Sequence, residues 1–96
     1  MQFPKTHPVR DKMFLEFIRS QPCLICFAQS VPHHLEIFGA SEKGDDWLTV
    51  PLCPQHHTLG PDSIHTLGEL RFNDRHMINV WEHTAKLQVK YHKDAA

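Results

Sequence analysis

The chain has 96 residues, of which 41% are hydrophobic, and its ten basic and eleven acidic side chains give a formal net charge of −1. This length suits one small domain over residues 1–96, and such a domain often needs a metal or a disulfide to supplement its core. The charge excludes a strongly basic protein that coats nucleic acid, and no apolar run approaches the roughly 20 residues that span a bilayer. Because residues 1–10 lack the apolar core of a signal peptide, we expect a cytoplasmic location and no contact with a membrane.

Hydrophobic spacing and breaker residues predict the elements of the first half. Residues 1–10 contain two prolines and predict an irregular arm, and apolar side chains at helical spacing predict an amphipathic helix over about 11–20. Pro22 ends that helix, and residues 23–26 follow as a tight turn. Two short strands are expected over 31–37 and 47–52, separated by a loop that contains Gly39 and Gly44.

The second half of the chain is expected to be helical. Pro54 suits the first turn of a helix that carries His56 and His57, and Gly60-Pro61 breaks that helix. A short helix is expected over 69–76, and one stripe of larger side chains predicts a closing helix over about 77–92. The residues after it should fray. The predicted fold class is α+β, with a core over about 21–76 flanked by terminal helices.

The three cysteines of the chain all occur in paired spacings. Cys23-x-x-Cys26 and Cys53-x-x-His56 each let two ligands from one turn reach one ion. Together they supply the four soft or borderline ligands of a tetrahedral zinc site. Zinc would then act as a staple, because in such a site the binding of the metal contributes free energy of folding.

Other interpretations of these residues remain open. Three cysteines cannot all pair within one chain, so a disulfide framework is not expected. The cysteines could be buried thiols beside a surface histidine, or Cys23-x-x-Cys26 could be a redox pair, although no βαβ pattern surrounds it. His57 could also take the fourth zinc position in place of His56.

Nine histidines are scattered along the chain, and four of them stand close to the two zinc half-sites. These four are His33, His34, His57 and His65. Adjacent residues of a strand point to opposite faces, so His33 could bind a metal while His34 acts on a nearby water. Any one of them could be an ordinary surface residue, but four beside a zinc scaffold favour a second, catalytic metal site.

The order of these residues resembles that of a zinc-stapled HNH endonuclease, a nuclease of the ββα-metal or His-Me finger type. The resemblance covers about residues 21–76 and runs, in order, through Cys23-x-x-Cys26, His33-His34-Leu35, Asp46, Pro51-Leu52-Cys53-x-x-His56-His57 and His65. The pattern is long and ordered, and it is most similar to small HNH proteins of phages and prophages, including those linked to recombination. It implies a ββα-metal core and hydrolysis of DNA to a 5′-phosphate and a 3′-hydroxyl.

The resemblance also implies a role for each histidine of the second site. It implies His34 as the general base and His33 and His57 as ligands of a catalytic divalent ion. The last ligand of the family comes one helical turn after His57, where this chain has Pro61. We therefore expect the helix to break after residue 59 and the chain to loop before it returns His65 to the site as the third ligand. An all-histidine ligand set is neutral and tolerates Mn²⁺, Ni²⁺, Co²⁺ or Zn²⁺ as well as Mg²⁺.

Three further residues are candidates for supporting roles. The middle asparagine of the HNH pattern falls near Leu48 and is missing. Asp46 could brace the loop in its place, orient His34 through the second ring nitrogen, or be a simple turn residue. Arg71 and Arg75 lie four apart on one predicted helix face, where they could hold a phosphate or be solvated.

The sequence therefore predicts a metal-dependent DNA endonuclease or nickase with little sequence specificity. Its near-neutral charge limits DNA affinity, so it could depend on a dimer or on a protein partner of the recombination or phage machinery. The alternative is a zinc-stapled module that binds nucleic acid or protein without catalysis, or an HNH protein that has lost its activity.

Overall fold

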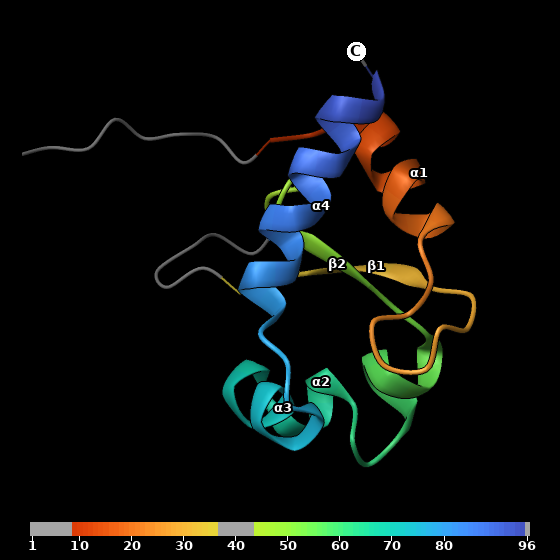
Figure 1. The fold of residues 1–96 in the computed structure, drawn as a ribbon. Helices are drawn as coiled ribbons and strands as arrows, with labels where there is room; N and C mark the ends of the chain where they lie inside the picture. Colours follow the sequence, from red (N-terminus) through yellow and green to blue (C-terminus); the bar gives the residue numbers. More distant parts are fainter. Residues whose placement is uncertain (1–8, 37–43, 96) are drawn as a thin grey trace, which may run out of the picture.

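The structure is a computed structural model that describes residues 9–36 and 44–95. It has the predicted α+β fold, with one two-stranded antiparallel sheet and several helices. In chain order the elements are α1 (Lys12–Ser20), β1 (Val31–His34), β2 (Thr49–Leu52), η1 (Gln55–Leu59), α2 (Ile64–Leu67), α3 (Glu69–His76) and α4 (Val80–Ala95). Figure 1 shows the strands in the middle of the molecule, with α1 and α4 side by side at one end and α2 and α3 at the other.

Helix α1 forms where the apolar spacing predicts it. The side chain of Asp11 accepts a hydrogen bond from the amide of Phe14 and caps the helix N-terminus. Phe14 and Ile18 are completely buried on the inner face. Gln21 is extended because it precedes Pro22, and the helix ends there as expected.

The sheet places the two adjacent histidines on opposite sides. His33 pairs with Val50 and His34 with Thr49 in the antiparallel register. Both strands are shorter than predicted. At β2, residues 47 and 48 form a turn in which the amide of Leu48 donates to the carbonyl of Asp45. At β1, residues 35 and 36 follow the last strand residue, and residue 37 lies outside the described part of the chain.

The terminal helices pack against each other and against the sheet. The ring of Tyr91 on α4 lies 5.1 Å from that of Phe14 and 5.2 Å from that of Phe17 on α1. The hydroxyl of Thr84 on α4 donates to the carbonyl of Thr49 at 2.9 Å, which fixes α4 to the start of β2. The main core lies between the sheet and the shorter helices and contains Cys23, Leu35, Val50, Leu52, Cys53, Ile64, Phe72 and Val80.

Three features of the second half differ from the prediction. Helix α2 was not predicted; the side chain of Ser63 caps it by accepting from the amide of Thr66. The closing helix starts at Val80 instead of Met77, because Met77 is left-handed with φ of 56° and ends α3. Helix α4 also continues to Ala95, past the predicted end at residue 92. Within the described residues, no helix is both long and apolar enough to span a bilayer.

Candidate functional site

The predicted zinc residues come together at one point of the fold. Cys23 and Cys26 lie in the turn after α1, whereas Cys53 follows β2 and His56 lies on η1. Their candidate ligand atoms all lie within 4.8 Å of one another. Sγ of Cys53 is 3.5 Å from Sγ of Cys26 and 3.2 Å from Nδ1 of His56. This Cys₃His cluster could bind a structural zinc.

Backbone hydrogen bonds hold the two halves of the Cys₃His cluster in place. The amide of Phe27 donates to the carbonyl of Cys23 at 3.0 Å, and Phe27 itself is left-handed with φ of 65°, which closes the turn. The amide of Leu24 donates to the carbonyl of Pro51 at 3.1 Å. This bond ties the first turn to β2, one residue before the strand ends and the chain reaches Cys53.

The chemistry of the Cys₃His cluster fits zinc. All three thiols are free, and the 3.5 Å between Sγ of Cys26 and Sγ of Cys53 is far longer than a disulfide bond of about 2.05 Å. With zinc bonds of about 2.3 Å to sulfur and 2.0–2.1 Å to nitrogen, tetrahedral ligand atoms stand roughly 3.3–3.8 Å apart. The fourth position belongs to His56, because His57 points to a different cluster.

A second cluster contains the three histidines predicted as ligands of the catalytic ion. His33 comes from β1, His57 from η1 and His65 from α2, and their candidate ligand nitrogens lie within 4.8 Å of one another. Nε2 of His57 is 3.2 Å from Nε2 of His65. Nε2 of His33 is buried and has no hydrogen-bond partner among the described residues. A buried polar atom without a partner is costly, and a bound cation would satisfy it.

The surroundings of this three-histidine cluster favour the neutral form of His33 and of His57. The pKa of His33 is lowered to about 3, mainly by burial and in smaller part by repulsion from His57, His65 and His34. Burial also lowers the pKa of His57, again with a contribution from His65. Neutral imidazole is the form that binds metal, so His33 and His57 are ready to donate lone pairs at neutral pH.

A wide turn and a new helix bring His65 back to His57. The amide of Gly60 donates to the carbonyl of Gln55, five residues earlier, at 2.9 Å, so η1 is a π-helical turn. A Cβ atom at Gly60 would lie 2.7 Å from that carbonyl oxygen, so only glycine fits without movement. The chain breaks at Pro61 as expected, and α2 then carries His65 beside His57.

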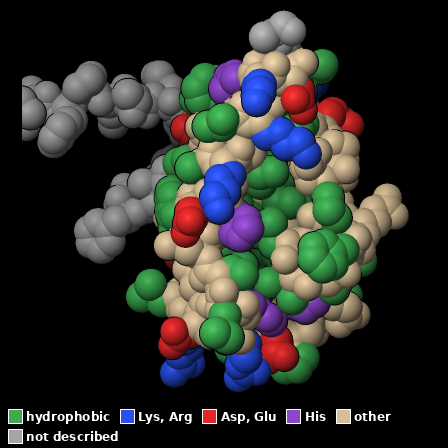
Figure 2. Space-filling model, in the orientation of Figure 1, with side chains coloured by type: hydrophobic (Ala, Val, Ile, Leu, Met, Phe, Trp, Pro, Cys, Tyr) green, Lys and Arg blue, Asp and Glu red, His purple; other side chains and the backbone are tan. Residues whose placement is uncertain are grey.

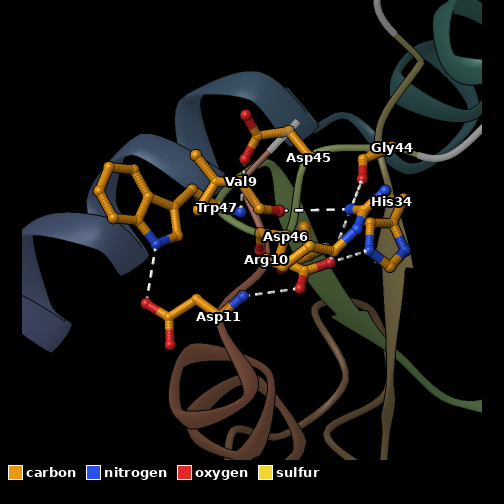
Figure 3. Close-up of polar contacts among 9 residues, drawn as sticks. Val9, Arg10, Asp11, His34, Gly44, Asp45, Asp46 and Trp47 are labelled. Atoms are coloured by element: carbon orange, nitrogen blue, oxygen red, sulfur yellow. Dashed lines mark hydrogen bonds and ion pairs between the residues drawn. The ribbon is translucent and has the colours of Figure 1, made fainter. Parts of the chain in front are cut away.

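His34 points away from the three-histidine cluster and toward Asp46. Nε2 of His34 lies 2.8 Å from Oδ1 of Asp46, as Figure 3 shows. Burial raises the pKa of Asp46, but hydrogen bonds from His34 and from the amide of Asp11 lower it more, so its pKa lies below the ordinary value. An ionised carboxylate only accepts hydrogen bonds, so Nε2 of His34 carries the proton and a neutral ring has its lone pair on Nδ1.

The two arginines predicted to hold a phosphate share one shallow pocket on α3. Arg71 and Arg75 line it together with Leu67 and Asp74. Arg75 forms an ion pair with Asp62, so its charge is already balanced. On the face drawn in Figure 2, Lys and Arg side chains are scattered among Asp and Glu side chains and do not form a single basic patch.

Residues that the sequence did not single out surround Asp46. The amide of Asp11 donates to its carboxylate, and the guanidinium of Arg10 contacts both that carboxylate and the carbonyl of Gly44. Arg10 and Asp11 lie 34 to 36 positions before these partners in the sequence, so no local sequence pattern connects them. The neighbouring Asp45-Asp46 pair was the one signal in the sequence for this region.

Comparison with known families gives one match. Residues 1–90 match the family described as "Protein of unknown function (DUF968)". Searches of the curated proteins and of the solved structures gave no match.

Proposed function

We propose that the chain, which by this match belongs to the DUF968 family, is a metal-dependent DNA endonuclease or nickase. One observation carries the proposal. Two adjacent histidines face opposite sides of β1, one in a cluster of three imidazoles and the other against a carboxylate. Hydrolysis of a phosphodiester needs both a cation near the phosphate and a base for water, and this strand offers a group for each task.

The three-histidine cluster would hold the catalytic divalent ion. His33, His57 and His65 supply nitrogen ligands, and the orphaned Nε2 of His33 supports this assignment. When bound, the ion supplies Lewis-acid stabilisation of the charge that develops on the phosphate and on the leaving oxygen. Mn²⁺, Ni²⁺, Co²⁺ and Zn²⁺ suit such ligands, and Mg²⁺ is also a candidate. The separate Cys₃His cluster would hold zinc only as a staple.

His34 would accept the proton of the attacking water. Its Nε2 is held by Asp46, which leaves the lone pair on Nδ1 for the water. The His34 side chain is 38% exposed, so a water and a substrate can reach it, whereas Asp46 at 8% is enclosed. Asp46 therefore orients the base and keeps its ring in one tautomer.

The substrate would be DNA, bound mainly through its backbone. Among the described residues we see no base-reading helix, so little sequence specificity is expected. The basic residues near the two ends of the chain include Arg10, Lys12, Arg19, Lys86, Lys90 and Lys93, and Lys5 lies outside the described residues. The near-neutral total charge predicts weak, salt-sensitive binding that a dimer or a protein partner, such as one from recombination or phage machinery, would assist.

Plasmid cleavage tests the proposal. With Mg²⁺ or Mn²⁺ the wild type should nick or cut supercoiled DNA, and His34→Ala should lower the rate about 10²–10⁴-fold. His83→Ala is the matched control, since His83 lies on α4 outside both clusters. If the wild type leaves the plasmid intact, or if His34→Ala cuts as fast as His83→Ala, the proposed base is wrong. Binding of DNA or protein without cleavage would favour the non-catalytic zinc module.

A further inference from the structure

We infer that Arg10 is a positioning residue that fixes the ring of His34 by way of Asp46. The inference rests on the proposed function, because His34 is the proposed base. The sequence indicated only an irregular arm before α1. In the structure, the last two residues of that arm, Val9 and Arg10, and the capping residue Asp11 lie against the loop that carries Asp46 (Figure 3).

Backbone hydrogen bonds dock this segment on both sides of Asp46. The amide of Asp46 donates to the carbonyl of Val9 at 3.0 Å. In the opposite direction, the amide of Asp11 donates to Oδ2 of Asp46 at 2.9 Å. Asp11 is itself fixed, since its side chain caps α1 and accepts from Nε1 of Trp47 at 2.9 Å. The segment is therefore anchored to α1 and to the loop at once.

Arg10 completes the arrangement at the other carboxylate oxygen. Its Nη1 lies 3.5 Å from Oδ1 of Asp46, the same oxygen that accepts from Nε2 of His34. Nη1 also donates to the carbonyl of Gly44. A Cβ atom at Gly44 would lie 2.8 Å from Cβ and 3.2 Å from Cδ2 of His34, so the loop runs close to this side chain and leaves no room for a larger residue. Arg10 thus joins Asp46, which is hydrogen-bonded to the ring of His34, to Gly44, which lies beside the His34 side chain.

Loss of the guanidinium should release both contacts. Without Arg10, the carbonyl of Gly44 and Oδ1 of Asp46 lose a shared cation, and the loop is free to move away from His34. The ring would then sample other orientations and tautomers, which slows proton transfer without removing the base. A role in positioning therefore predicts a change in kcat and little change in KM.

Kinetics on a labelled DNA duplex test this inference. Arg10→Ala should lower kcat about 10-fold and change KM less than about 2-fold. Arg10→Lys keeps a cation near Asp46 and should stay within about 3-fold of the wild type. Arg19→Ala is the charge-matched control: it removes an exposed arginine of α1 that pairs with Glu16, so any general loss of DNA affinity should appear in both variants, whereas kcat should fall only in Arg10→Ala. In the Asp46→Asn background, Arg10→Ala should have almost no further effect if Arg10 acts through Asp46.

A spectroscopic readout separates this inference from the proposed function. In NMR spectra of the histidine ring nitrogens, Arg10→Ala should shift or broaden the His34 signals and leave those of His83 unchanged, whereas Arg19→Ala should leave both unchanged. If the wild type cuts no DNA, the proposed function fails, and the ring spectra still decide the role of Arg10. Unchanged His34 signals would overturn the inference, as would a larger effect of Arg10→Ala on KM than on kcat.

Discussion

His33 and His34 are neighbours in the sequence, yet the alternation of β1 gives them different surroundings. His33 is 8% exposed and lies among imidazoles, whereas His34 is partly exposed and contacts a carboxylate. Strand alternation predicts this division without any structure. The choice between His56 and His57 as the zinc residue was left open, because both follow Cys53 within one helical turn. In the structure, the direction in which η1 starts places His56 beside the three cysteines and His57 beside His33 and His65.

The role of Arg10 could not be predicted at the residue scale. Its partners Gly44 and Asp46 are 34 and 36 residues away, and periodicity and spacing report only local neighbours. One of the three roles expected for Asp46 was to orient His34 through a ring nitrogen; a hydrogen bond joins the two side chains, and the role itself stays a prediction.

The buried state of His33 predicts a pH dependence of stability. The pKa of His33 is about 3 in the folded chain and about 6.5 in the unfolded chain. At a pH between these two pKa values, the unfolded chain therefore binds more protons than the folded chain. Without an ion at the three-histidine cluster, lowering the pH from 6.5 to 5.5 should cost about 1 kcal/mol of unfolding free energy through this residue. Denaturant unfolding at both pH values should show a loss that is about 1 kcal/mol larger in the wild type than in His33→Asn, because the half-buried His57 contributes in both proteins. Equal losses in the two proteins would contradict the assignment.

At the scale of elements, long periodic segments were predicted well and short ones were not. Helix α3 spans the predicted residues, and α1 differs by one residue at its start. Helix α2 has only four residues, too few for a periodic pattern, so Ser63 was its single signal. The start of α4 was wrong because Met77 takes a left-handed conformation that normally favours glycine. The position of His65 beside His57 depends on two short elements that the sequence did not predict in this form, the π-helical turn η1 and the helix α2.

Substitution of Gly60 tests the importance of the wide turn. Gly60→Ala places a Cβ atom 2.7 Å from the carbonyl oxygen of Gln55, so η1 must shift and displace His57 relative to His65. We expect a loss of about 1–3 kcal/mol of unfolding free energy. Calorimetric titration with Mn²⁺ should show weaker binding at the three-histidine cluster, while the zinc content stays at one ion per chain. The control is Thr58→Ala, an exposed position of the same turn. Equal Mn²⁺ affinity in the two variants would contradict this account.

At the scale of the whole molecule, the Cys₃His cluster joins the turn after α1 to the start of η1. The turn after α1 and the start of η1 are far apart in the sequence, and Cys23 and Cys53 are part of the main core. The α+β class and the order of elements were predictable, because paired ligand spacings and helix breakers are local signals. The packing of α1 on α4 was not, since it depends on aromatic contacts between the two ends of the chain.

Removal of one exposed thiol tests the zinc staple. Cys26 is exposed, so Cys26→Ser changes little packing and reports mainly on the metal. Because zinc binding contributes directly to folding, we expect Tm to fall by more than about 10 °C and the bound zinc to be lost. His57→Ala should keep both the zinc and most of the Tm. An unchanged Tm in Cys26→Ser would mean that the domain folds without the staple.

We propose that the two metal clusters have separate roles: the Cys₃His cluster stabilises the fold, and the three-histidine cluster acts with His34 to cleave DNA. The most direct test of this proposal is removal and return of metal, with zinc content and plasmid cleavage measured on the same sample. EDTA should abolish cleavage while about one zinc per chain remains, and added Mn²⁺ should restore cleavage to the wild type but not to His34→Ala. Cleavage that survives EDTA, or that Mn²⁺ restores equally in His34→Ala, would contradict the account.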